Sequence, residues 1–191
     1  MCHSTETALL RVHNDLTRAP EHKQMDILLL LDLSAAFDTV KHNILLDRLS
    51  GKYGIRGDAL RWIKSYLSER EQFVALGKFC SPSKPLETGI PQGSVLGPLL
   101  FTLYISPLAD ITKHHNLDSH FYADDSQLNV FFDRKVDIQD NIKLIEECVK
   151  EIKVFMMRNC LEFNEDKTEI VSFGSDYNMR QLSSIEIKIG E

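Results

Sequence analysis

Three segments predict an α+β fold in which a largely antiparallel sheet is backed by helices. Residues 27–31 form a continuous apolar run of strand length, which is typical of a strand buried on both faces. Aromatic residues precede the step Ala123-Asp124-Asp125 and a polar-apolar alternation follows it, as in a β-hairpin. Between positions 138 and 155 apolar residues recur every three or four positions, as in an amphipathic helix. The order of these segments favours a strand-helix-strand-strand-helix-strand plan, the ferredoxin-like arrangement.

Glycine and proline residues separate the other elements that we expect. Helices are predicted at 4–16, 42–49, 58–67 and, after Pro98, 99–105. Residues 72–79 are predicted to pair with 86–88 as a hairpin, and two more strands are predicted at 169–173 and 185–189. With 191 residues, 43% of them apolar, the chain can bury a substantial core, so we assign residues 1–191 to one domain.

Composition narrows the class of protein. The net charge of −6 argues against a protein that binds nucleic acid over its whole surface, although a local basic groove is compatible with it. The four cysteines are scattered and the seven histidines show no metal-ligand spacing, which suits reduced thiols in an intracellular protein. The longest apolar run is too short to span a bilayer, and the N-terminus has no signal-peptide pattern, so we expect no membrane partner.

The adjacent carboxylates Asp124 and Asp125 are the first candidates for chemistry. Like charges side by side are costly when partly buried unless a cation or a donor compensates them. Asp32 leaves the buried strand and could lie beside this hairpin, and three carboxylates could hold two divalent ions for a phosphoryl displacement. Magnesium suits such a site, because it prefers few carboxylates, several waters and phosphate oxygens. The alternatives are an ordinary acidic turn and, for Asp32, a helix-capping aspartate.

The motifs that contain these carboxylates resemble the reverse-transcriptase palm of LINE-type non-LTR retrotransposons, in particular the jockey-like group. The similar segments are the run from Leu28 through Asp32 to Asp38, the loop from Gly89 to Pro98, and Phe121-Tyr-Ala-Asp124-Asp125. Residues 163–169 resemble a fourth motif, Asn-x-x-Lys-Thr, and 3–8 resemble a segment found upstream of the palm. The order and spacing agree over nearly the whole chain, which makes the match specific.

The resemblance implies an RNA-directed DNA polymerase with a palm-type fold. It implies that Asp32 and Asp124 ligate two catalytic Mg²⁺ ions, with Mn²⁺ as an alternative, and that Asp125 is an auxiliary carboxylate. The partners would be an RNA template, a DNA primer and deoxynucleoside triphosphates. The primer 3′-hydroxyl would attack the α-phosphate of the incoming nucleotide and pyrophosphate would leave.

The resemblance also implies roles for four other residues. Phe37 matches a steric gate that would collide with a 2′-hydroxyl, and Gln92 and Gly93 match a loop along the nucleotide and template base. Lys167 matches a lysine near the leaving pyrophosphate, where it could donate a proton. Each residue also has a purely structural alternative. Phe37 could be a buried phenylalanine, Gln92 and Gly93 could form a plain turn before a helix, and Lys167 could be a surface lysine.

The chain also departs from the family pattern. Residues 1–25 correspond to a pre-palm helical segment, and the family's finger motifs, thumb and endonuclease are expected in the parent protein outside this sequence. The alternative function is therefore a catalytically inactive remnant that keeps the palm fold. An RNA-templated RNA polymerase is disfavoured by Ala123 and Phe37. Nuclear or cytoplasmic localisation is not decided by the sequence.

Overall fold

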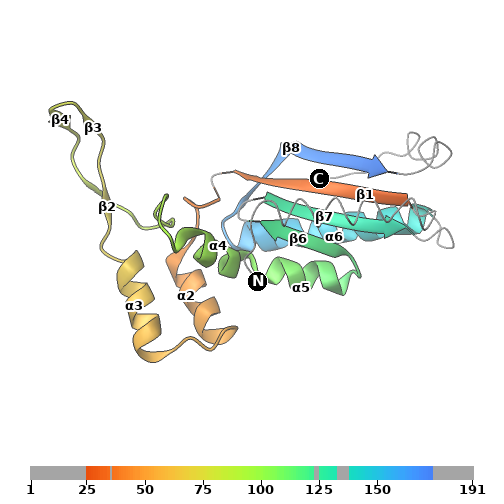
Figure 1. The fold of residues 1–191 in the computed structure, drawn as a ribbon, viewed down its shortest axis with the longest axis horizontal. Coiled ribbons are helices and arrows are strands. Elements are labelled where there is room, and N and C mark those ends of the chain that lie inside the picture. Colours follow the sequence, from red (N-terminus) through yellow and green to blue (C-terminus); the bar gives the residue numbers. More distant parts are fainter. Residues whose placement is uncertain (1–24, 35, 123–124, 133–137, 174–191) are drawn as a thin grey trace.

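The computed structural model describes residues 25–34, 36–122, 125–132 and 138–173. Figure 1 shows a twisted sheet with helices α5 and α6 against it, a group of three other helices (α2, α3 and α4) at one end, and a thin β-structured arm that projects from that group. The helices are α2 (His42–Gly51), α3 (Gly57–Leu67), α4 (Gly97–Ile105), α5 (Pro107–His114) and α6 (Ile138–Arg158).

The main sheet has four antiparallel strands in the order β6-β7-β1-β8. Their bounds are β1 (Met25–Ser34), β6 (Asp118–Tyr122), β7 (Asp125–Phe132) and β8 (Glu162–Phe173). The first strand of the chain therefore lies in the middle of the sheet, between the third and the fourth, as the ferredoxin-like plan requires. The predicted α+β class, with an antiparallel sheet backed by helices, is confirmed.

Burial explains why β1 is central. Ile27 and Leu29 are each 1% exposed, and Leu28 on the opposite face is 6% exposed, so both faces of the strand are covered. The inner face packs in one cluster with apolar residues of α6, including Ile145, Val149 and Ile152. The helical spacing of these residues places them on one face of α6, which is the face that meets the sheet.

Several helix boundaries were predictable from turn residues. Pro98 lies in the first turn of α4, as expected, because its missing N–H would have no partner there. Pro107 is the first residue of α5, a helix that we did not predict as a separate element. The predicted helix at 4–16 and strand at 185–189 lie outside the described residues. Within the described part of the chain, no helix is long and apolar enough to cross a membrane.

The arm, defined here as residues 71–85, consists of two short ladders: β2 (Glu71–Gln72) pairs with β5 (Lys84–Pro85), and β3 (Ala75–Leu76) pairs with β4 (Phe79–Cys80). The predicted pairing of 72–79 with 86–88 is wrong. Thr88 instead forms a bridge to Lys41, because its hydroxyl and the Gly89 N–H bond to the loop that follows β1.

A polar cluster joins α2, α4 and the end of α6. The Arg48 guanidinium donates to the Tyr104 carbonyl and, at 2.7 Å, to Asn159 Oδ1. The Tyr104 hydroxyl donates to the Asn159 carbonyl at 2.6 Å. Burial lowers the pKa of Arg48 and raises the pKa of Tyr104, so each pKa shift follows mainly from loss of water around the group. The cluster connects α2 and α4 to the chain directly after α6, the long helix that packs against the sheet.

Candidate active site

Asp32 lies near the C-terminal end of β1, where the strand emerges from the core. Its side chain is 34% exposed, whereas Leu31 before it is 4% exposed. Leu30 pairs with Glu169 of β8 but Asp32 pairs with Asn164, so four residues of β8, 165–168, lie opposite Leu31 alone. Such a bulge bends the strand and redirects its side chains. The C-terminal end of β1 is therefore irregular and accessible to solvent, although β1 is a central strand of the sheet.

The β6-β7 hairpin ends beside Asp32. Tyr122 pairs with Asp125, which leaves a two-residue connection, and Leu31 pairs with Ser126. One position further along each strand are Asp32 and Asp125, so the register brings these two backbone positions to the same end of the sheet. The predicted hairpin is confirmed. Ala123 and Asp124 lie outside the described residues, as does the side chain of Asp125.

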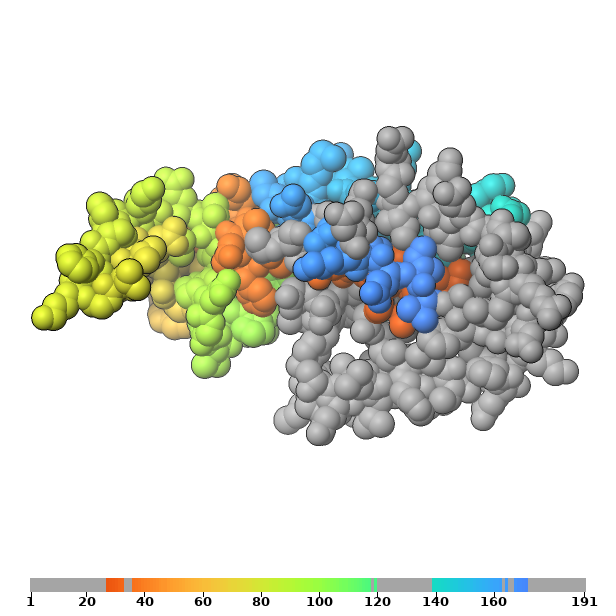
Figure 2. Space-filling view, turned by 90° about the horizontal axis from the view of Figure 1, so that it is seen from above, coloured from red at the N-terminus to blue at the C-terminus, as the bar shows by residue number. Residues whose placement is uncertain are grey.

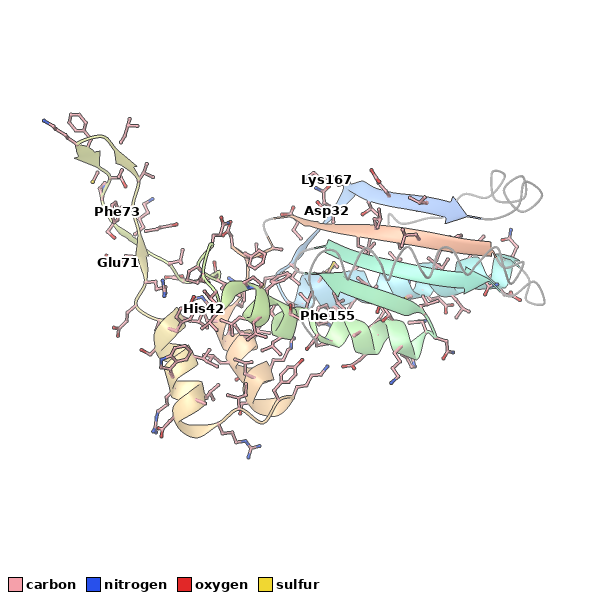
Figure 3. All side chains as sticks on the ribbon, viewed as in Figure 1. Asp32, His42, Glu71, Phe73, Phe155 and Lys167 are labelled. Atoms are coloured by element: carbon pink, nitrogen blue, oxygen red, sulfur yellow. The ribbon has the colours of Figure 1, made fainter. Side chains whose placement is uncertain are left out.

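Lys167 lies within the β8 bulge, and its ammonium is 3.7 Å from Asp32 Oδ2. Figure 3 shows the two labelled residues at the same end of adjacent strands. The Thr168 hydroxyl donates to the Asn164 carbonyl at 2.9 Å and closes the bulge around the lysine. Because the Lys167 side chain is 71% exposed, the pair contributes little to stability, about 0–1 kcal/mol. The pair matters because it places the Lys167 ammonium beside the Asp32 carboxylate.

The loop before α4 is held against the loop after β1 by backbone hydrogen bonds. The Gly89 N–H donates to the Val40 carbonyl and the Ile90 N–H donates to the Phe37 carbonyl, each at 2.8 Å. Gly89 has a φ of +90°, and a Cβ there would lie 3.0 Å from the Asp38 carbonyl oxygen. A glycine is therefore needed for both the conformation and the close approach.

Phe37, Gln92 and Gly93 all lie at this joint. The Phe37 ring is half-buried against Phe101 of α4, with 4.8 Å between the ring centroids. The Gln92 amide donates to both carboxylate oxygens of Asp38, at 3.1 and 3.3 Å. Gly93 is exposed in a turn with a φ of +74°. The packing of Phe37 on Phe101 and the turn at Gly93 are compatible both with a local structural role and with a role toward a ligand.

Three residues that the sequence did not single out complete the joint. Asp38 accepts from Gln92, and its carbonyl accepts from the Thr88 hydroxyl at 3.1 Å. His42 Nε2 lies 2.7 Å from the Gly89 carbonyl and donates to it. Asp38 directly follows Phe37 in a recognised motif, which was the available signal. Nothing in the sequence pattern pairs His42 with a loop 47 residues away.

The oxygen donors at this end of the sheet suit a hard divalent cation better than a soft one. The Asp32 carboxylate is accessible, is already paired with a cationic group, and lies next to the strand on which Asp125 stands. The arrangement can bind and orient a phosphate-bearing ligand through a cation. The 37–42 loop, which follows β1 in the chain, is held to the 88–93 loop by backbone hydrogen bonds.

Comparison with known proteins identifies the family. Residues 3–187 match the family described as reverse transcriptase (RNA-dependent DNA polymerase). The chain is 35% identical over 129 residues to the RNA-directed DNA polymerase from mobile element jockey of Drosophila melanogaster, a match that covers 65% of the chain. It is 30% identical over 136 residues, 66% of the chain, to a probable RNA-directed DNA polymerase from transposon BS of the same fly. The chain spans 14% of the length of each relative.

Solved structures agree on the fold. The apo telomerase of Candida tropicalis superposes with a TM-score of 0.66 at 14% identity, over 91% of this chain and 36% of that one. The telomerase of Candida albicans, solved in complex with a fragment of telomeric RNA, gives the same TM-score over 88% of this chain and 30% of its own. The resemblance to the jockey-like group expected from the motifs is confirmed, and the chain belongs to the reverse transcriptase family.

Proposed function

We propose that this chain is the palm of an RNA-directed DNA polymerase that extends a DNA primer with deoxynucleotides on an RNA template. The observation that carries the proposal is the accessible Asp32 carboxylate at the end of β1, beside the β6-β7 hairpin on which Asp125 stands. Members of the family use divalent metal ions, and we assign Asp32, Asp124 and Asp125 as the residues that would hold two Mg²⁺ ions, with Mn²⁺ as a substitute. When bound, such ions neutralise phosphate charge and lower the pKa of a hydroxyl nucleophile.

The residues of the chain would position the substrate. Phe37, backed by Phe101, would lie beneath the incoming sugar as a rigid plane that a 2′-hydroxyl would strike. Gln92, oriented by Asp38, and the side-chain-free Gly93 would line the path of the nucleotide and template base. Lys167 would leave Asp32 once metal cations bind that carboxylate, and it would then donate a proton to the departing pyrophosphate.

The decisive experiment places this chain inside a longer relative, because the chain spans 14% of the jockey polymerase. In the chimera, residues 3–187 replace the matching segment of that polymerase, and primer extension on RNA is measured with Mg²⁺. We expect extension by the parent chimera and a loss of at least about a hundredfold in Asp32→Asn, since a metal ligand supplies several kcal/mol of transition-state stabilisation. Asp47→Asn, an exposed carboxylate on α2, is the matched control and should keep full activity.

The outcomes separate the candidates. Extension by the parent and Asp47→Asn chimeras but not by Asp32→Asn supports the polymerase. Full extension by Asp32→Asn would remove this carboxylate from the active site. A correctly folded parent chimera that does not extend any primer would favour the inactive remnant, the alternative that the sequence left open.

The assignment of Phe37 has its own test. Phe37→Val should raise the incorporation of ribonucleotides relative to deoxynucleotides by about tenfold or more, because steric rejection of one polar group is worth about 1–3 kcal/mol. The ratio of the two kcat/KM values is the measurement, since it does not depend on how much of the variant is folded. An unchanged ratio would leave Phe37 with only its packing role against Phe101.

A further inference from the structure

Two histidines and a glutamate come together where the C-terminus of α5 meets α6. His114 is the last residue of α5 and His115 follows it, while Glu151 lies on α6. One potential ligand atom from each of these side chains lies within 4.8 Å of the other two. The spacing of histidines along the sequence gave no hint of this cluster, because its carboxylate is 36 residues away from His115.

We propose that His114, His115 and Glu151 form a transition-metal site, with zinc as the preferred ion, that joins α5 to α6. Two imidazoles and one carboxylate are an established ligand set for zinc, which leaves a fourth position for water. This set contains nitrogen donors and therefore differs in kind from the all-oxygen carboxylates at Asp32, where magnesium is expected.

Two of the three proposed ligands, His115 and Glu151, are already in contact. His115 Nε2 and Glu151 Oε2 are 2.8 Å apart, and the His115 side chain is only 13% exposed, so its position is fixed by packing. The centroids of the His114 and His115 rings are 5.3 Å apart, and the angle between the ring planes is 73°. Ligands around tetrahedral zinc lie about 3.4 Å apart, so His115 and Glu151 would separate by about 0.6 Å as zinc replaces the proton between them. The exposed His114 ring would move closer by about 1 Å or slightly more.

The surroundings favour a cation at this point. Both histidines lie at the C-terminus of α5, where the unpaired carbonyls of a helix carry partial negative charge. Asn116, two residues after the end of α5, has a φ of +55°, and the chain turns there toward the start of β6 at Asp118.

The site has a structural consequence that is separate from the proposed polymerase function. β6 starts three residues after His115 and runs toward the hairpin that carries Asp124 and Asp125. A metal between α5 and α6 would hold the start of β6 on the helical layer and leave the active-site end free. Among the described residues, this is the one group of three such side chains with ligand atoms this close.

The test is a calorimetric titration of Zn²⁺ into the chelator-treated 191-residue protein. We expect one zinc per chain and a rise in the thermal unfolding temperature with zinc, because an ion that binds only the folded state stabilises it. His114→Ala and Glu151→Gln should each weaken this binding by at least about tenfold, since even the outer partners of metal ligands cost about 10- to 100-fold when removed. Both side chains are accessible, and circular dichroism of the metal-free variants will check that they fold.

Two controls isolate the site. His42→Gln removes a histidine from α2, and Asp32→Asn removes the candidate catalytic carboxylate; both should bind zinc as tightly as the parent chain. Undiminished binding by His114→Ala and Glu151→Gln, or absence of zinc binding by the folded parent, would overturn the proposal. Loss of binding in Asp32→Asn alone would show that the zinc sits at the candidate active site instead. None of these results depends on whether the chain polymerises DNA.

Discussion

The main sheet and the arm are both antiparallel β-structure, yet they are stabilised in different ways. In the sheet, β1 lies between two strands and its inner face packs on α6, so its apolar residues are out of water. In the arm, every residue from Glu71 to Pro85 is exposed, including Phe79 at 81%. Figure 2 shows this segment extending away from the body. The sheet is held by burial, and the arm is held by its own short ladders of hydrogen bonds.

The difference teaches that apolar composition does not by itself identify a core. Phe79 in the arm is largely exposed, whereas Phe101 in α4 is 0% exposed and supports Phe37. Both residues were expected to lie in regular elements, and both do. What separates them is packing partners: α4 packs against α2 and shares one core cluster with β1, whereas no arm residue belongs to the core of the described residues.

The sharpest form of this comparison uses the cysteines. Cys80 in β4 of the arm is exposed, and Cys148 on α6 is buried with a pKa raised to about 12, first by burial and then by the charge of Glu151. The thiolate is the reactive form, and its fraction at pH 8 is about a thousandfold smaller for a pKa of about 12 than for the ordinary value of 9.0. We expect iodoacetamide to alkylate Cys80 at least about a thousandfold faster than Cys148.

Mass spectrometry of tryptic peptides after timed alkylation gives the two rates. Because the pKa of Cys148 is raised, its reactivity should increase as pH rises toward that value, and denaturant should make both thiols react at similar rates. Comparable rates for the two cysteines in the folded protein at pH 8 would contradict the burial difference.

Truncation of one phenylalanine in the core and one in the arm should change the free energy of unfolding by different amounts. Phe101→Ala removes a fully buried ring and should lower the free energy of unfolding by about 3–5 kcal/mol, as large-to-small changes in cores do. Phe79→Ala removes an exposed ring and should change it by no more than about 0.5 kcal/mol. Urea unfolding followed by circular dichroism measures both. A destabilisation by Phe79→Ala of the same size as that of Phe101→Ala would mean that the arm is part of the folding core.

A third test concerns the polar cluster that joins the helical end to the sheet layer. Arg48→Met should lower the free energy of unfolding by about 3 kcal/mol, because it removes hydrogen bonds from a charged group and leaves the acceptors at Tyr104 and Asn159 without them. Arg61→Met is the control, since Arg61 forms an exposed ion pair with Asp58 on α3 and should cost less than about 1 kcal/mol. Equal effects of the two substitutions would show that the cluster is no stronger than a surface pair.

The sequence predicted the sheet well because its signals are local. The apolar run of β1, the aromatic hairpin and the helical spacing of α6 each lie within one segment, and the family motifs fix their order. The β8 bulge was not predictable, since it appears only when residues 165–168 are set against the single residue Leu31. The same holds for the contact of Lys167 with Asp32, which that bulge creates.

Contacts between residues far apart in the sequence were also not predictable. The bond from His42 to the Gly89 carbonyl, the bond from Gln92 to Asp38 and the meeting of His114 with Glu151 all join different elements. Hydrophobic periodicity states which face of an element is buried but not which polar groups meet at its ends. The arm was misassigned for a related reason. The predicted strand at 72–79 contains a turn at 77–78, across which β3 pairs with β4, and Thr88 and Gly89 bond instead to the loop after β1.

The smallest expected difference concerns two glycines that both have positive φ. Gly77 in the arm has a φ of +60° and open space around it, so Gly77→Ala should cost about 1 kcal/mol from backbone conformation alone. Gly89 has a φ of +90° and lies against Asp38, so Gly89→Ala should cost about 2 kcal/mol, since conformational strain adds to the close contact. Urea unfolding of the two variants measures this difference of about 1 kcal/mol. An equal cost at both positions would mean that the joint between the 37–42 and 88–93 loops yields as readily as the arm, and that it cannot hold Phe37 and Gln92 in place.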